Sequence, residues 1–318
     1  MNYEPYIEKW TAEICEVVIG ATSQEGGSRS KVLRTGGSKT LPLLNFEGGA
    51  KNKPAIVAEV VDYLPEDLWP TFYESLKDVV SDPIKWIKEV EKLQPDAICV
   101  RLLSCHPDIK NNSVDYIKSF IPEVLKTTSL PLIILGCEHI ERDTEILPVV
   151  CELTKGEKIL VGMAVKENYK TISLSAFACG HSVIAQTPLD INLAKQLNIL
   201  INDTGVPLDK IVMHHTTGGL GYGFEYCYSI MERCRLAGLQ GDAVMATPII
   251  NLIGEETWKT KEAKATKDEE PLWGEEPVKR GIFWETTTAL GYLQAGSDII
   301  VLVHPETVKN IKSFLSQI

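Results

Sequence analysis

The stretch with the clearest chemical potential is the glycine-rich loop Thr217-Gly218-Gly219-Leu220-Gly221-Tyr222-Gly223. It follows an apolar run expected to be a strand and precedes residues 224–236, which are expected to form a helix. Glycines let the backbone approach a ligand closely, and a helix N-terminus offers free amides to an anion. The spacing is not Gly-x-Gly-x-x-Gly, so a dinucleotide-binding loop is not predicted. Two alternatives stay open, a ligand contact and a tight strand-to-helix turn.

Two further motifs are weaker. His214 and His215 end the preceding strand, but neighbouring strand residues point to opposite faces, so one metal ion is not readily bound by both. We expect one of them to face the ligand side and the other to pack outward. The segment Gly36-Gly37-Ser38-Lys39-Thr40 resembles a phosphate-binding loop, yet Ser38 separates Gly37 from Lys39 and the upstream glycine is missing. A phosphate loop is therefore excluded there.

The cysteines do not predict a cluster or a metal site. They occupy positions 15, 99, 105, 137, 151, 179, 227 and 234. The closest pairs are six and seven residues apart, whereas metal and iron–sulfur sites favour pairs such as Cys-x-x-Cys. Most are expected to be small core residues. No nucleophilic triad or carboxylate pair can be placed from the sequence either. Polar residues expected at strand ends are Asp62, Arg101, Ser104, Glu138, Glu167, Asn168, Asp190, Asn251 and His304.

The elements that must position these residues follow a repeating pattern. Short apolar runs rich in β-branched residues alternate with amphipathic helical stretches; the runs are 55–61, 97–101, 132–135, 159–163, 182–185, 210–213, 247–252 and 298–303. Continuous apolar runs are typical of parallel strands buried on both faces. Eight strand–helix units of this length predict an α/β fold, a (β/α)8 TIM barrel with an N-terminal hairpin extension. A doubly wound sheet is the alternative.

Two segments lie outside the repeat. Residues 1–53 are expected to be an N-terminal extension in which 17–22 and 30–34 pair as a hairpin that closes the N-terminal mouth of the barrel, formed by 54–318. Residues 255–280 hold eight acids, six bases and two prolines, and are predicted to be a charged insertion on the C-terminal face without its own core. Such an insertion is either a lid or a docking loop. Trp258 and Trp273 within it are candidate interface anchors, with packing onto the barrel as the alternative.

Composition narrows the function classes. Lys and Arg total 32 against 43 Asp and Glu, which gives a formal charge of −11. A chain this acidic has little electrostatic reason to bind nucleic acid or an anionic membrane. The apolar runs are strand-length, well short of the ~20 residues of a membrane span, and the first residues carry acids where a signal peptide carries bases. A cytoplasmic location is expected.

Three long strings carry a family resemblance. They are residues 18–30 with 45–48, residues 188–202, and residues 218–233 with 239–242; Trp273-Gly274 and Trp284-Glu285 match as well. In these the chain resembles the small (delta) subunit of the corrinoid/iron–sulfur protein of the acetyl-CoA pathway, the acetyl-CoA decarbonylase/synthase delta subunit family. It departs from the family at His214-His215-Thr216, where Asp-Pro-Ser is typical.

The resemblance implies a TIM barrel related to pterin-dependent methyltransferases. It implies that the barrel mouth covers a cobalamin-type corrinoid held mainly by a large subunit, which also carries the [4Fe–4S] cluster. The heterodimer then carries a methyl group from methyltetrahydrofolate, through its methyltransferase, to CO dehydrogenase/acetyl-CoA synthase. The sequence contains no Asp-x-His-x-x-Gly, and we expect this subunit to have no independent catalysis and no metal of its own.

Residues at the strand ends and in the glycine-rich loop are the expected cofactor contacts. They are Thr216, Thr217, Gly218, Gly219, Gly221, Tyr222, Asn168, Asp190 and Asn251. The alternative function is a stand-alone methyltransferase barrel that binds a pterin itself. In that case Asn168 and Asn251 would bind the pterin ring. Binding of methyltetrahydrofolate by the isolated chain would distinguish the two.

Overall fold

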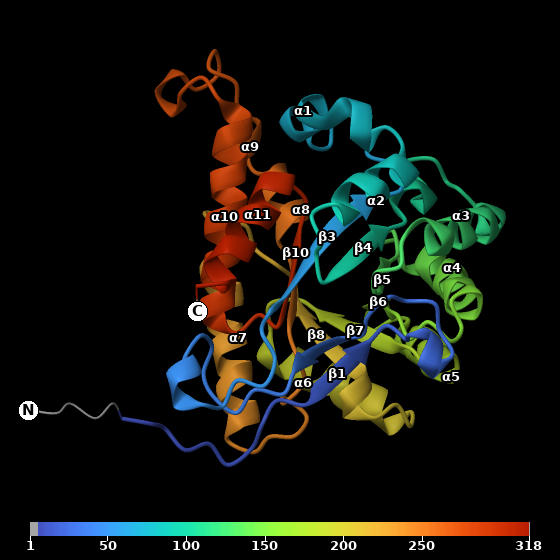
Figure 1. Cartoon of the computed structure of the whole chain (residues 1–318), viewed down its shortest axis with the longest axis vertical. Coiled ribbons are helices and arrows are strands. Elements are labelled where there is room, and N and C mark those ends of the chain that lie inside the picture. The colour runs from blue at the N-terminus through green and yellow to red at the C-terminus, as the bar shows by residue number, and fades with distance from the viewer. Residues whose placement is uncertain (1–5, 318) are drawn as a thin grey trace, which may run out of the picture.

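The eight apolar runs form eight parallel strands, as the sequence predicts. In the computed structural model, which describes residues 6–317, the strands follow one another around a barrel in chain order (Figure 1). They are β3 (Ala55–Val61), β4 (Ala97–Arg101), β5 (Leu132–Leu135), β6 (Leu160–Ala164), β7 (Ser182–Thr187), β8 (Ile211–His215), β9 (Ile250–Leu252) and β10 (Ile299–Leu302). A single bridge between Met213 and Ile249 joins β8 to β9, so the barrel is nearly closed. The predicted TIM barrel is confirmed.

Helices surround the barrel. They are α1 (Pro70–Val80), α2 (Pro83–Glu91), α3 (Val114–Thr127), α4 (Ile140–Leu153), α5 (Tyr169–Ala178), α6 (Ile191–Asp203), α7 (Phe224–Leu239), α8 (Ile253–Lys259), α9 (Lys261–Lys264), α10 (Pro277–Ala295) and α11 (Pro305–Leu315). Within residues 6–317, no helix combines the length and the apolar character needed to cross a bilayer.

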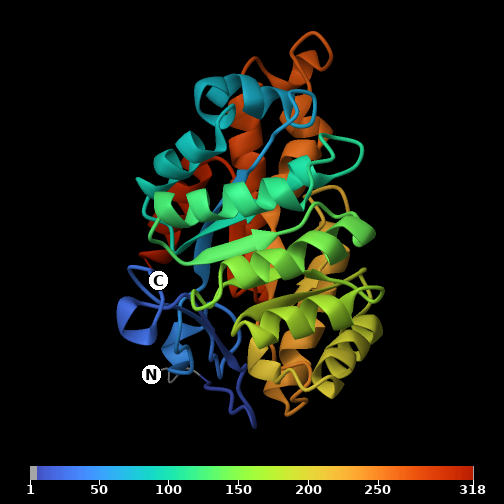
Figure 2. The same ribbon diagram turned by 90° about the vertical axis from the view of Figure 1, so that its right-hand side faces the viewer.

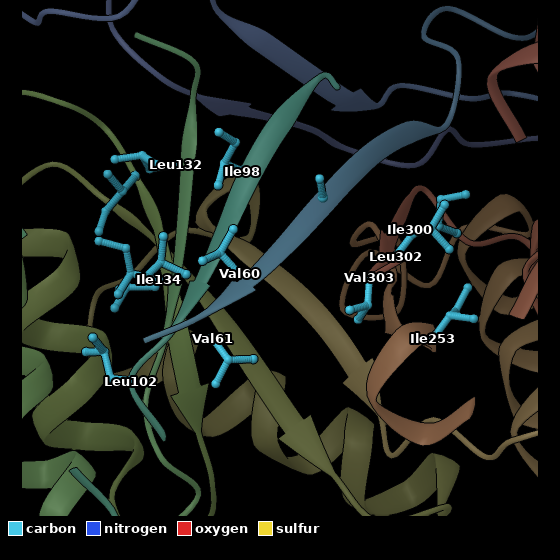
Figure 3. Close-up of a cluster of buried hydrophobic side chains, with 14 of the residues drawn as sticks. Val60, Val61, Ile98, Leu102, Leu132, Ile134, Ile253, Ile300, Leu302 and Val303 are labelled. Carbon is cyan, nitrogen blue, oxygen red and sulfur yellow. The ribbon is translucent and has the colours of Figure 1, made fainter. Parts of the chain in front are cut away.

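Alternation along the strands divides the core into two layers. In β4, Ile98 and Val100 belong to the outer layer between strands and helices, whereas Ala97 and Cys99 belong to the lumen. Figure 3 shows part of the outer layer, with Ile98, Ile134 and other strand residues. In β4 and β8 the alternation continues to the mouth, whereas in β6 the register shifts and Leu160 and Met163, three residues apart, both face the lumen.

The N-terminal hairpin lies against the lower end of the barrel (Figures 1 and 2). Its strands β1 (Glu16–Ile19) and β2 (Leu33–Gly36) pair antiparallel. Val17 and Ile19 are fully buried and belong to the same cluster as the lumen residues. The hairpin therefore seals the N-terminal mouth with apolar side chains, as the sequence predicts. Gly36 has φ +77°, and a Cβ there would lie 2.2 Å from the Cys15 carbonyl oxygen.

The structure differs from the sequence prediction in the first part of 255–280. Residues up to 264 form α8 and α9, and Trp258 is fully buried, with its ring centroid 5.2 Å from that of Phe72 and 5.6 Å from that of His304. The alternative of packing onto the barrel is thus correct for Trp258. The charges misled the prediction because Glu255 and Lys259 are paired rather than solvated. The segment between α9 and α10 projects from the body of the protein, at the top of the view in Figures 1 and 2.

A buried carboxylate fastens α10 to the end of β10. Glu285 is fully buried and accepts hydrogen bonds from the Val303 amide (2.6 Å), the Thr307 hydroxyl (2.8 Å) and the Trp258 indole N–H (3.1 Å). Burial outweighs these donors and raises the pKa of Glu285 from 4.5 to about 7. Its proton therefore binds more tightly in the folded chain than in the unfolded chain.

We predict that Glu285 makes the free energy of unfolding fall as the pH rises from about 4.5 to about 7. A carboxyl whose folded pKa is raised stabilises the fold most when protonated, and the loss can reach about 3 kcal/mol. The variant Glu285→Gln lacks this titrating group. The free energy of unfolding of the wild-type chain should therefore fall relative to that of the variant as the pH rises across this range. Urea unfolding at several pH values measures it. Parallel stability curves for the two chains would contradict the prediction.

Candidate functional site at the carboxyl-terminal mouth of the barrel

Two cavities lie side by side at the carboxyl ends of the strands. The first mouth cavity, about 580 Å³, is lined by Glu138, Asn168, Gln186, Thr216 and neighbouring residues from the ends of β5 to β8. The second mouth cavity, about 670 Å³, is lined by Trp69, Arg101, Glu138, Glu255, Lys264 and neighbours from the ends of β3, β4, β5 and β9. Glu138 lines both, so the two cavities adjoin and together form one broad mouth.

Arg101 lines the second mouth cavity and is the centre of a group of ion pairs. Its guanidinium is 2.6 Å from a Glu59 oxygen, 2.7 Å from a Glu138 oxygen and 2.5 Å from a Glu255 oxygen. Lys259 pairs with the other Glu255 oxygen at 2.6 Å. Arg101 and Glu59 are buried, at 2% and 0% exposed. Three carboxylates from three different parts of the chain thus converge on one buried cation, which we call the Arg101 cluster.

The pKa values of the two buried carboxyl groups in this cluster shift in opposite directions. Burial raises the pKa of Glu59, and the attraction of Arg101 does not fully offset it. Burial also acts to raise the pKa of Glu255, but Arg101 and Lys259 outweigh it and hold that pKa below its ordinary value. One oxygen of Glu59 has no hydrogen-bond partner among the described residues. Glu255 is therefore the firmly charged partner of Arg101, and Glu59 the more weakly held one.

The two histidines diverge as the strand geometry requires. His214 faces inward, with its Nε2 3.2 Å from the Thr217 hydroxyl, and His215 lies on the opposite face of β8. Both are buried; burial lowers the pKa of His214 to about 3 and that of His215 to about 4. Both rings are therefore neutral at pH 7. Within residues 6–317, no group of three or more His, Cys, Asp or Glu side chains could hold a metal ion.

Two side chains of α10 hold the glycine-rich loop by hydrogen bonds to its backbone. The Tyr292 hydroxyl donates to the Gly218 carbonyl (2.5 Å), and the Trp284 indole donates to the Leu220 carbonyl (3.0 Å). A Cβ on Gly218 would lie 2.5 Å from the Gly223 backbone, so that glycine is explained by the turn itself. Gly221 has φ +80° and open space where a Cβ would lie, and both it and Tyr222 are exposed. The tight-turn alternative accounts for the base of the loop and leaves its tip open to a ligand.

Only some of the predicted contact residues meet at the mouth. Thr216 and Asn168 line the first mouth cavity, although an Asn168 oxygen already accepts a hydrogen bond from the Val165 amide (2.9 Å). Asp190 caps α6, accepting from the amides of Asn192 and Leu193.

The others lie apart from the two mouth cavities. Thr217 is buried and accepts from the Leu252 amide (3.0 Å). Asn251 points away from the lumen, fully buried, with its amide nitrogen 3.5 Å from the Met231 sulfur. Tyr222 lies in a separate groove of about 1070 Å³ lined by residues of α1, α9 and the start of α10, which we call the outer groove. Gly219 approaches the Thr260 side chain, at 3.2 Å from an added Cβ.

Sequence reasoning missed the Arg101 cluster as a unit. It placed Arg101 and Glu138 at strand ends but paired neither, and it overlooked Glu59. One signal was available. Glu59 interrupts the apolar run of β3, and a charge in a strand buried on both faces requires a partner nearby.

Comparison with known proteins gives a consistent family. The family model described as CO dehydrogenase/acetyl-CoA synthase delta subunit matches residues 16–311. Subunit delta 1 of the acetyl-CoA decarbonylase/synthase complex from Methanosarcina thermophila is 35% identical over 312 residues, covering 96% of this chain and 71% of that protein. Subunit delta from Archaeoglobus fulgidus is 32% identical over 317 residues, covering 98% and 70%.

Solved structures with a similar fold include dihydropteroate synthases. The enzyme from Xanthomonas albilineans superposes with a TM-score of 0.55 at 10% identity, covering 84% of this chain and 93% of that chain. The enzyme from Thermus thermophilus superposes with a TM-score of 0.54 at 11% identity, covering 84% of this chain and 95% of that chain. At these identities the likeness shows the barrel fold alone.

We predict that Arg101→Met destabilises the fold by about 3–5 kcal/mol, because it leaves buried carboxylates without their cation. Adding Glu59→Gln should restore part of the loss, since it removes the most deeply buried charge. Arg34→Met is the matched control, because Arg34 forms an exposed pair with Glu16, and surface pairs contribute about 0–1 kcal/mol. Urea unfolding measures all three. A loss below about 1 kcal/mol in Arg101→Met would show that the cluster does not hold the mouth together.

Proposed function

The chain belongs to the CO dehydrogenase/acetyl-CoA synthase delta subunit family, and on this premise we propose that it is the small subunit of a corrinoid/iron–sulfur protein. In this proposal the barrel mouth covers a corrinoid held mainly by a large subunit, which also carries the [4Fe–4S] cluster. The heterodimer receives a methyl group from methyltetrahydrofolate through its methyltransferase and delivers it to CO dehydrogenase/acetyl-CoA synthase. The chain itself contributes a cap and a docking surface.

The observation that carries this proposal is the form of the mouth. Arg101 pairs with Glu59 and Glu255 at the top of the lumen. The second mouth cavity lies against this cluster, and the first extends from Glu138 over the ends of β6 to β8 towards α6. Arg101 is occupied by Glu59, Glu138 and Glu255. This arrangement suits a large ligand that lies across the mouth better than a small substrate that must reach a catalytic group inside.

The mouth residues fit a corrinoid. That group is a broad, flat ring edged with amide side chains, so a cap needs apolar contact and hydrogen-bonding groups spread around a rim. The rim of the first mouth cavity offers Lys166, Gln186, Gln196 and Thr216 together with apolar residues such as Leu193. These side chains would hydrogen-bond the edge of the ring. The corrinoid, when bound, supplies the cobalt that carries the methyl group; the residues of this chain orient the ring and exclude water from its covered face.

The projecting segment between α9 and α10 supports a docking role. Leu272 at its tip is 98% exposed. The tip is nevertheless fixed, because Arg280 donates to the backbone carbonyls of Glu262, Ala265 and Trp273. A large apolar side chain on a preorganised projection is a favourable interface anchor, since little conformational freedom is lost on binding.

We predict that the purified chain alone contains no cobalt and does not bind methyltetrahydrofolate, whereas its complex with the large subunit retains a corrinoid. Metal analysis, corrin absorbance and calorimetric titration with methyltetrahydrofolate measure these properties. Stoichiometric iron and acid-labile sulfide in the isolated chain would contradict the division of cofactors. Tight binding of methyltetrahydrofolate by the isolated chain would instead establish the alternative, a pterin-binding methyltransferase barrel.

We predict that Leu272→Ser weakens binding to the large subunit about tenfold or more, because a buried apolar anchor contributes above about 1 kcal/mol. Leu174→Ser is the matched control: Leu174 is 44% exposed on α5, away from the projection. Titration of each variant with purified large subunit gives the dissociation constants. Unchanged affinity in Leu272→Ser would remove the projection from the interface.

A further inference from the structure

A separate cavity lies at the end of the barrel opposite the mouth. Its volume is about 360 Å³. Lys53 and Pro54, directly before β3, line it together with Ser297 and Asp298, directly before β10, so it lies at the amino ends of these strands. Its walls come from the segment 38–54 on one side and from the last turns of α7, α10 and α11 on the other. We call it the amino-end cavity.

The amino-end cavity carries an excess of positive charge. Three cations line it, Lys51, Lys53 and Arg235, against one carboxylate, that of Asp298. This carboxylate is engaged, because it accepts from Arg235 Nη2 at 2.7 Å and from the Ile249 amide at 2.8 Å. Among the described residues of the two mouth cavities, by contrast, acids outnumber lysines and arginines. In a chain with a formal charge of −11, the charges therefore favour an anion in the amino-end cavity.

Arg235 is the buried cation of this cavity, at 4% exposed. A guanidinium has five N–H donors. Within residues 6–317 only Nη2 is used, donating to the Asp298 carboxylate and to the Gly296 carbonyl. Nε has no partner there and is enclosed, whereas Nη1, which also forms no hydrogen bond, keeps some exposed surface. Since buried polar groups are almost always hydrogen-bonded, an acceptor in the cavity would complete this guanidinium.

Two lysines of the segment before β3 add to this donor set. Lys51 pairs with Glu16 at 3.0 Å, and Lys53 donates to the Leu315 carbonyl at 3.0 Å. An ammonium group has three N–H donors, so both lysines retain donors for a ligand. Lys53 has no carboxylate partner among the described residues, so its charge is not neutralised.

Much of the remaining wall is apolar. Leu41 and Leu43 line the cavity from the segment, and Leu293 and Leu315 line it from α10 and α11. A volume of about 360 Å³ is within the range of cavities that bind small organic molecules. A ligand that fits both parts of the wall has a charged group at one end and an apolar body at the other.

We propose that the amino-end cavity binds a small amphiphilic anion, a molecule with one carboxylate or phosphate group and a short apolar chain. The charged group would accept from Arg235 Nη1 and from Lys53, with Lys51 beside it, and the chain would lie against the leucines. Because the contacts come from both walls, a bound ligand would hold the segment 38–54 against the barrel. The site lies away from the mouth and does not depend on the proposed function.

The test follows thermal unfolding of the purified chain at constant ionic strength with hexanoate, hexyl phosphate or neutral 1-hexanol. We expect at least one anion to raise the unfolding temperature saturably, and 1-hexanol to have no such effect. Lys51→Gln combined with Lys53→Gln should weaken the apparent affinity about tenfold or more, because charged hydrogen bonds are lost. The control combines Lys279→Gln with Lys309→Gln, two exposed lysines that pair with neighbouring glutamates. It should bind within about twofold of the wild-type chain.

The two anions also identify the charged group, since stabilisation by only one of them assigns a carboxylate or a phosphate. Amide hydrogen exchange locates the site: with the anion bound, exchange should slow in residues 38–54. No stabilisation by either anion would overturn the proposal, and so would equal stabilisation by 1-hexanol. Undiminished affinity in the Lys51 and Lys53 double variant, or stabilisation without slower exchange in residues 38–54, would show that the anion binds elsewhere.

Discussion

The structure of the carboxyl-terminal end of this barrel depends on the burial of one guanidinium, that of Arg101. Arg101 ends β4 and points into the lumen, where a lone charge would be very costly. Its partners come from β3, from the loop after β5 and from α8, so the neutralised cluster ties together strand ends that are far apart in the chain. The hairpin seals the opposite end with Val17 and Ile19. The barrel is thus closed by apolar packing below and by ion pairs above.

This closure shapes what the mouth can do. Because Arg101 is held by three carboxylates, the surface open to a ligand lies in the two mouth cavities and at the tip of the glycine-rich loop. A mouth of this kind is suited to covering one face of a large ligand. This geometry supports the proposed role of the chain as a subunit that covers a large cofactor held by another protein.

The sequence was sufficient for the fold because the signals that specify it are local. Continuous apolar runs, helical spacing and strand alternation predicted the barrel, and alternation alone placed His214 and His215 on opposite faces. The Arg101 cluster was not predictable in the same way, because Glu59, Glu138 and Glu255 meet only after the barrel has closed. Trp258 was assigned to a charged insertion for a related reason: its neighbour Glu255 is buried and paired with the half-buried Lys259, which composition cannot reveal.

Amide hydrogen exchange of this chain, with and without the corrinoid-loaded large subunit, tests the central claim most directly. If the mouth covers the cofactor, exchange should slow in residues 165–168 and 216–223 at the carboxyl ends of the strands, and the hairpin strands β1 and β2 should be unchanged. Protection confined to the hairpin or to the outer faces of α3 to α6, with the mouth exchanging as in the free chain, would contradict the account.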